Sequence, residues 1–101
     1  MKYLITRHPG ALHWLQGQIS EPFHHLTHIS DLGLIQPGDW VIGSLPLHLV
    51  ADICVRGARY FHIDVHLPES LRGCELTAQQ LTELDAEIVE YTVREMPARH
   101  I

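Results

Sequence analysis

The sequence predicts a single α/β domain with a small, mostly parallel, Rossmann-like sheet of about four strands and three helices. Short apolar runs rich in β-branched residues alternate with helical patterns, which is typical of a parallel sheet covered by helices. The 101 residues suffice for one hydrophobic core and not for two. We therefore treat residues 1–101 as one domain.

The N-terminal part predicts a strand, a helix and a second strand. Lys2 to Arg7 contains the apolar run Tyr-Leu-Ile of a buried strand, and Pro9-Gly10 ends it. A helix is expected from near Pro9, because proline suits a first helical turn. Its apolar positions are Ala11, Leu12, Leu15 and Ile19. Phe23 to Ile29 is a strand candidate whose pattern is interrupted by His24, His25 and His28.

The middle of the chain predicts a strand, a helix and a strand. The turn Pro37-Gly38-Asp39 precedes the apolar strand Trp40 to Gly43. Pro46 opens a helix that Gly57 closes, and its apolar stripe is Leu47, Val50, Ala51, Cys54 and Val55. Arg59 to Val65 then has the aromatic and β-branched content of a strand.

The C-terminal part predicts one long helix. Thr77 and Gln80 have the spacing of a capping box, so the helix is expected to begin there. Its buried stripe would be Leu81, Leu84, Ile88 and Tyr91, and Pro97 would end it. The acidic residues between Glu83 and Glu95 would form its solvent-exposed face.

The first candidate site is the loop Arg7 to Gly10, after the first strand. Ligands of open α/β sheets bind beyond the carboxyl ends of the strands, where this loop is expected. Arg7 can contact a phosphate with two charge-assisted hydrogen bonds, and His8 can transfer a proton near neutral pH. Free amides at the following helix start also favour anions. The alternative is that Arg7 and His8 only solvate a turn.

Two further loops are expected at the same edge, after Gly43 and after Val65. Gly43 would let a ligand approach the backbone, Ser44 could contact a phosphate, and His48 falls in the first turn of the next helix. The alternative is that Ser44 only caps this helix and that His48 is only solvated. The third loop, Val65 to Gly73, adds Arg72 and Gly73 to the residues expected near the ligand.

The pattern His62-x-Asp64-x-His66 is a candidate metal site. The three side chains would share one face of a strand, and the set suits zinc or iron. The alternative is a solvent-exposed polar face, because Phe61, Ile63 and Val65 occupy the other one. Trp14 and Trp40 fit core positions, or could stack on a nucleobase if exposed.

Composition excludes several classes of function. The net charge of −5 argues against a surface for long nucleic acids. No apolar run approaches the ~18 residues of a membrane span, and the N-terminal run is too short for a signal peptide. We therefore expect a cytoplasmic protein. Cys54 and Cys74 follow no spaced motif, so no disulfide is expected in a reducing compartment.

Several stretches together resemble one known family. They are residues 5–11 with Trp14, residues 37–39 with 41–46, residues 56–60, Leu67-Pro68 and residues 72–76. The chain is similar to the small type III CRISPR accessory proteins of the Csx-sixteen type. The resemblance covers nearly the whole chain, and its segments occur in the family's order.

This resemblance implies a metal-independent ring nuclease without a cofactor, acting as a homodimer on cyclic oligoadenylate, the second messenger of type III CRISPR defence. The ring would be cyclic tetra-adenylate, cleaved by attack of a ribose 2′-hydroxyl to give 2′,3′-cyclic phosphate ends. Arg7, His8 and Ser44 are the expected catalytic residues. The expected ligand-binding residues are Thr6, Pro9, Gly10, Gly43, Leu45, Pro46, His48, Arg72 and Gly73.

Two alternatives stay open. One is a module that binds and sequesters cyclic oligoadenylate without cleaving it. The other is a histidine phosphatase, because that family also opens with a strand ending in Arg-His. Its histidine is followed directly by glycine, however, whereas Pro9 stands between His8 and Gly10, and this chain is short for that fold.

Overall fold

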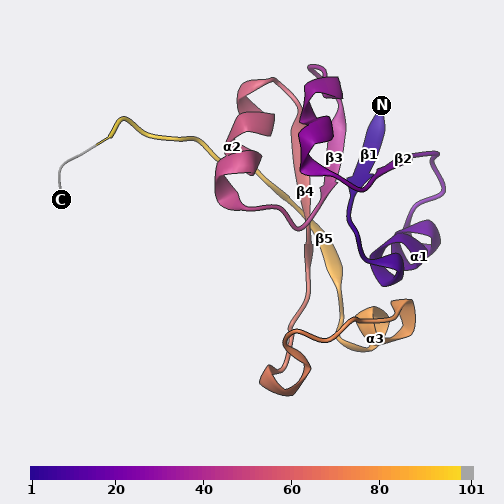
Figure 1. Cartoon of the computed structure of the whole chain (residues 1–101). Coiled ribbons are helices and arrows are strands. Elements are labelled where there is room, and N and C mark those ends of the chain that lie inside the picture. Colours follow the sequence, from indigo (N-terminus) through magenta and orange to yellow (C-terminus); the bar gives the residue numbers. More distant parts are fainter. Residues whose placement is uncertain (99–101) are drawn as a thin grey trace.

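The computed structural model describes residues 1–98 and confirms the α/β class (Figure 1). Its one sheet has the strand order β2-β1-β3-β4-β5. The first four strands are parallel to one another, and β5 runs antiparallel to β4. The strands are β1 (Lys2–Ile5), β2 (His24–Leu26), β3 (Trp40–Gly43), β4 (Arg59–Asp64) and β5 (Glu87–Tyr91).

Helices cover both faces of the sheet, as alternating strands and helices require. One face carries α1 (Pro9–Gln18) and α3 (Ala78–Glu83), and the other carries α2 (Leu47–Val55) with the 3₁₀ helix η1 (Ile29–Leu34). A second 3₁₀ helix, η2 (Glu69–Leu71), precedes α3. The predicted helix start at Pro9 is confirmed.

Alternation along the strands creates two hydrophobic layers. Leu4, Ile42 and Phe61 face α1 and α3, where they pack with Trp14 and Leu15. The alternate residues face α2 and η1; they include Tyr3, Ile5, Val41 and Tyr60. Each fully buried aliphatic or aromatic side chain contributes about 1.5–3 kcal/mol, so the two layers hold the central strands in register.

The predicted long C-terminal helix is wrong. The capping box of Thr77 and Gln80 is present, but α3 ends at Glu83, and Asp85 adopts a left-handed conformation with φ of 55°. The chain then reverses into β5 and pairs with β4 along its full length. Ile88 and Tyr91 therefore belong to a fifth strand, beyond the four expected, and not to a helical stripe.

Residues 87–91 form a strand because all five pair with β4, and side-chain contacts between the two strands add to this pairing. Arg59 donates two hydrogen bonds to the carboxylate of Glu90, at 2.7 and 2.8 Å. Tyr91 donates its hydroxyl hydrogen to Asp64 at 2.8 Å. Opposite charges on neighbouring strands favour antiparallel pairing.

Candidate functional site

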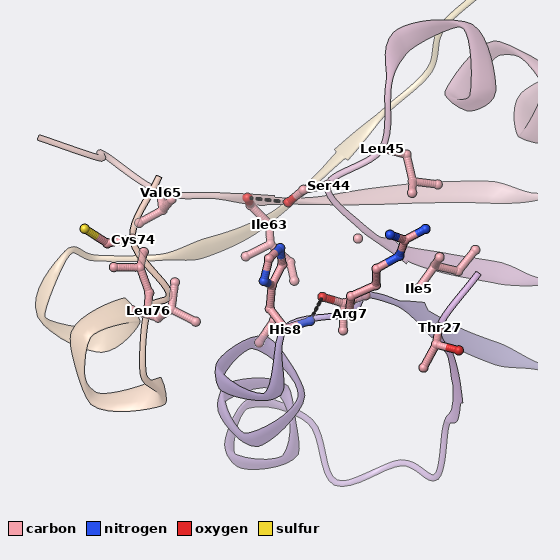
Figure 2. Close-up of a pocket in the computed structure, with 14 residues that line it drawn as sticks. Ile5, Arg7, His8, Thr27, Ser44, Leu45, Ile63, Val65, Cys74 and Leu76 are labelled. Atoms are coloured by element: carbon pink, nitrogen blue, oxygen red, sulfur yellow. Dashed lines mark hydrogen bonds between the residues drawn. The ribbon is translucent and has the colours of Figure 1, made fainter. Parts of the chain in front are cut away.

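A cleft of about 320 Å³ opens at the carboxyl edge of the parallel strands (Figure 2). It lies where this sheet topology places ligand sites. The ends of β1, β3 and β4 meet there with the segment that leads into α3, and the residue after β2 and one residue each of α1 and α3 complete the lining. The lining residues are Ile5, Thr6, Arg7, His8, Ala11, Thr27, Gly43, Ser44, Leu45, Ile63, Val65, Cys74, Leu76 and Leu81.

The loop after β1 is held by hydrogen bonds on both sides of Thr6. The Thr6 amide donates to the carbonyl of Leu26 at 3.1 Å, and its side-chain oxygen accepts from the amide of His8 at 3.1 Å. His25 Nε2 donates to the Thr6 carbonyl at 2.8 Å. The backbone before α1 is thus fixed, while the side chains of Arg7 and His8 remain exposed.

Arg7 supplies the positive charge of the cleft. Its guanidinium group extends toward the loop of Ser44 and Leu45 (Figure 2). Within residues 1–98, no carboxylate lies within ion-pair distance of it. A guanidinium group without an acidic partner can bind a phosphate with two parallel hydrogen bonds.

Gly43 allows β1 and β3 to approach each other at their ends. A Cβ atom at this position would lie 2.8 Å from the carbonyl oxygen of Ile5. The requirement for glycine therefore comes from the neighbouring strand, whereas the sequence suggested close approach of a ligand. The next residue, Ser44, is exposed, and its hydroxyl donates to the carbonyl of Ile63 at 3.4 Å. This long contact leaves the hydroxyl able to turn toward a ligand.

Tyr60, on the face of the sheet that α2 covers, holds the loop after β3 with two hydrogen bonds. Its phenol oxygen accepts a hydrogen bond from the amide of Leu45 at 3.0 Å and donates to the carbonyl of Gly43 at 3.1 Å. His62 Nδ1 lies 2.6 Å from the same oxygen. When Nδ1 of His62 carries hydrogen, it donates to the phenol oxygen, which then donates one hydrogen bond and accepts two. Burial raises the pKa of Tyr60, so the phenol keeps its proton.

The substitution Tyr60→Phe should lower the free energy of unfolding by about 1–3 kcal/mol, because it removes the hydrogen bonds of the phenol to the carbonyl of Gly43 and the amide of Leu45. The matched control is Tyr91→Phe, which removes an exposed hydroxyl bonded only to Asp64 and should change stability by less than about 0.5 kcal/mol. Urea unfolding of both variants measures the difference. Equal stabilities would show that the phenol does not hold the loop.

His8 contacts an acidic side chain from a distant part of the chain. Its Nδ1 lies 2.7 Å from Oε1 of Glu75, and both side chains are exposed. Glu75 precedes α3 in a segment that packs on the first turn of α1. Gly10 makes this packing possible, because a Cβ atom there would overlap the carbonyl group of Leu76. Gly10 is therefore required for packing between these two segments.

The structure brings six of the residues predicted from the sequence together in the cleft: Thr6, Arg7, His8, Gly43, Ser44 and Leu45. The other six do not line it; they are Pro9, Gly10, Pro46, His48, Arg72 and Gly73. Pro46 precedes α2 as its N-cap residue, and His48, Arg72 and Gly73 are exposed outside the cleft.

Sequence reasoning missed the apolar end of the cleft and the partner of His8. Val65, Cys74 and Leu76 form one side of this end (Figure 2), and Ala11 and Leu81 also line it. Thr27 follows β2, so the carboxyl-edge rule could have found it, and the same rule did place the loop that begins at Val65 at this edge. Glu75 carries no comparable signal, because only the packing of its segment on α1 brings it to His8.

The candidate metal ligands do not gather into a site. His62 Nε2 lies 3.7 Å from Asp64 Oδ1, but His66 follows the end of β4 and is exposed. In the described part of the chain, no three histidine, cysteine, aspartate or glutamate side chains are grouped as metal ligands would be. Cys54 and Cys74 are both free thiols.

A protein-family model matches nearly the whole chain. The family model described as "Putative CRISPR-associated protein (Cas_VVA1548)" matches residues 3–94. The chain belongs to this CRISPR-associated family. The matched range includes every residue that lines the cleft, so the site lies within the family's domain. No curated protein and no solved structure matches the chain.

The family description states an association with CRISPR systems and names no reaction. Among residues 1–98, none of the helices has both the length and the apolar character that a membrane crossing requires.

Proposed function

We propose that the protein is a ring nuclease that binds and cleaves cyclic oligoadenylate, with cyclic tetra-adenylate as the substrate. One observation carries the proposal: Arg7, His8 and Ser44, from the ends of two neighbouring parallel strands, line the same cleft. A cation, an imidazole and a hydroxyl are the groups needed to hold a phosphodiester and move a proton beside it. Membership of a CRISPR-associated family supports a nucleotide signal of CRISPR defence as the ligand.

The proposed reaction is intramolecular. A ribose 2′-oxygen attacks the adjacent phosphorus, and the bond from phosphorus to the 5′-oxygen breaks. His8 accepts the proton of the 2′-hydroxyl, and the leaving 5′-oxygen takes a proton from water. The products carry a 2′,3′-cyclic phosphate and a 5′-hydroxyl. Because the nucleophile belongs to the substrate, the reaction does not need a metal ion to generate hydroxide.

Each cleft residue has a separate task in this reaction. Arg7 stabilises negative charge on the phosphoryl oxygens, which increases as the 2′-oxygen attacks. Ser44 orients a phosphate oxygen or the 2′-hydroxyl so that the attacking and leaving oxygens are in line with phosphorus. The apolar end of the cleft offers a surface on which a base could pack while the phosphate faces Arg7.

The direct test is incubation of labelled cyclic tetra-adenylate with the protein, with and without EDTA. We expect linear products with 2′,3′-cyclic phosphate ends, and equal rates in both samples. Retention of intact ligand would indicate the sequestering module instead. A rate lost in EDTA and restored by zinc would favour a metal-dependent reaction. If the protein neither binds nor cleaves cyclic tetra-adenylate, the proposed ligand is wrong.

The substitution Arg7→Ala should weaken binding of cyclic tetra-adenylate by at least about tenfold, because a charge-assisted contact to phosphate is worth about 1.5–3 kcal/mol. Its melting temperature should stay near that of the wild type, since the side chain is exposed. Calorimetric titration measures the loss. Arg94→Ala is the matched control, because it removes the same charge from an exposed residue outside the cleft. Normal binding by Arg7→Ala would show that the site is misplaced.

A homodimer is part of the proposal. One cleft is small compared with a ring of four nucleotides, and a twofold axis would present Arg7, His8 and Ser44 of each subunit to opposite sides of the ring. We expect one ring per two chains, measured by calorimetric titration and analytical ultracentrifugation. Two opposed cuts would give a two-nucleotide final product, with a four-nucleotide linear species before it. One ring per monomeric chain would contradict this arrangement.

A further inference from the structure

His8 and Glu75 form a polar pair at the cleft, although 67 positions separate them in the sequence. The 2.7 Å distance joins Nδ1 of the ring to Oε1 of the carboxylate. An ionised carboxylate only accepts hydrogen bonds, so the hydrogen of this contact belongs to Nδ1. A neutral His8 then carries its lone pair on Nε2, on the side of the ring away from Glu75.

The backbone around Glu75 is fixed on both sides. Before it, the amide of Cys74 donates to the carbonyl of Leu71 at 3.1 Å, which closes the turn that follows η2. After it, the Thr77 side chain accepts from the amide of Gln80 at 3.1 Å, and the Gln80 side chain accepts from the amide of Thr77 at 2.9 Å. The segment also lies against Gly10, two residues from His8.

The pair is poorly suited to stabilising the fold. The side chains of His8 and Glu75 are 67% and 62% exposed, and ion pairs at such positions add little to stability. The geometry of the contact between His8 and Glu75 instead determines which nitrogen of His8 carries hydrogen and how the ring is oriented. Catalytic histidines use a carboxylate in this way to keep one nitrogen available as a base.

We propose that Glu75 is a positioning residue that holds His8 with hydrogen on Nδ1 and leaves Nε2 free to accept a proton in the cleft. The catalytic consequence rests on the proposed function, whereas the tautomer does not. In the cleavage step, Nε2 takes the proton of the ribose 2′-hydroxyl, and the 2′-oxygen bonds to phosphorus. The bond to the 5′-oxygen breaks, and that oxygen is protonated by water. The Nδ1–H group of the imidazolium stays hydrogen-bonded to Glu75, and Nε2 then releases its extra proton to solvent.

The first test reads the tautomer without any substrate. Long-range ¹H–¹⁵N spectra of the labelled protein, at a pH where the ring is neutral, should show His8 with hydrogen on Nδ1. The substitution Glu75→Ala should shift His8 toward the form with hydrogen on Nε2, which free histidine prefers in water. Glu83→Ala is the matched control; it removes an exposed carboxylate of α3 outside the cleft and should leave the tautomer unchanged.

The second test measures cleavage of cyclic tetra-adenylate. Glu75→Ala should lower kcat by at least about tenfold with little change in KM, because ground-state binding depends on other groups. Glu75→Asp should recover part of the loss. Wild-type His8 with hydrogen on Nε2 would overturn the proposal whatever the activity. A tautomer shift with unchanged kcat would overturn the catalytic part of it. The expected tautomers in a protein that never cleaves would confirm the positioning and refute the proposed function.

Discussion

Replacement of His8 with alanine should lower the turnover of cyclic tetra-adenylate by roughly 10²-fold or more, while binding is largely kept. The expectation follows from the division of tasks in the cleft. Arg7 and Ser44 still meet the phosphate, and the backbone of the loop is fixed by Thr6 rather than by the His8 ring. The missing group is the proton acceptor for the 2′-hydroxyl.

Single-turnover rates and calorimetric titration separate the two effects of His8→Ala. The matched control is His13→Ala, because His13 is exposed on α1, the helix that follows His8, and does not line the cleft. It should cleave and bind like the wild type. Turnover by His8→Ala near that of the wild type would remove His8 from proton transfer. His48, or positioning of the substrate alone, would then have to account for the rate.

The position of the cleft was predictable because it depends on local signals and one rule of topology. The run before Arg7 and the run before Ser44 each read as a short buried strand. Parallel strands end at the same edge, so two such ends had to meet if the strands were neighbours. The structure pairs β1 directly with β3, with Ile5 opposite Gly43, and this register brings the two loops together.

The region after Thr77 was not predictable from its own pattern. Leu81, Leu84, Ile88 and Tyr91 fit the spacing of a helix, while residues 87–91 also fit a strand. The strand forms because residues 87–91 pair with β4, which lies far away in sequence, and Arg59 and Asp64 of β4 add side-chain contacts to this pairing. Tertiary pairing of this kind overrides local propensity.

The structural role of the glycines in the two loops was also not predictable from the sequence alone. The sequence assigned Gly43 to the ligand because glycine permits close approach of any group, and the family resemblance placed Gly10 among the ligand-binding residues. In the structure, the groups that approach are backbone carbonyls of the protein itself, from Leu76 and Ile5. A glycine in the sequence shows that space is needed, and only the fold shows what occupies that space.

The substitution Gly10→Ala should lower the free energy of unfolding by about 1–3 kcal/mol, the usual cost of forcing a methyl group into a packed site. The new Cβ would overlap the backbone of Leu76, so α1 and the segment before α3 must separate. Backbone cannot rotate away as a flexible side chain can. This separation should also part Glu75 from His8, and turnover should therefore fall in the folded protein.

Gly17→Ala is the matched control for Gly10→Ala. Gly17 lies in the same helix with no atom within 4 Å of an added Cβ, and alanine is favoured over glycine in a helix by roughly 0.5–1 kcal/mol. Urea unfolding should therefore move in opposite directions for the two variants. Equal stability of both would show that α1 and the Glu75 segment are not in close contact. Loss of stability in Gly10→Ala with turnover unchanged would instead separate this packing from the chemistry of His8.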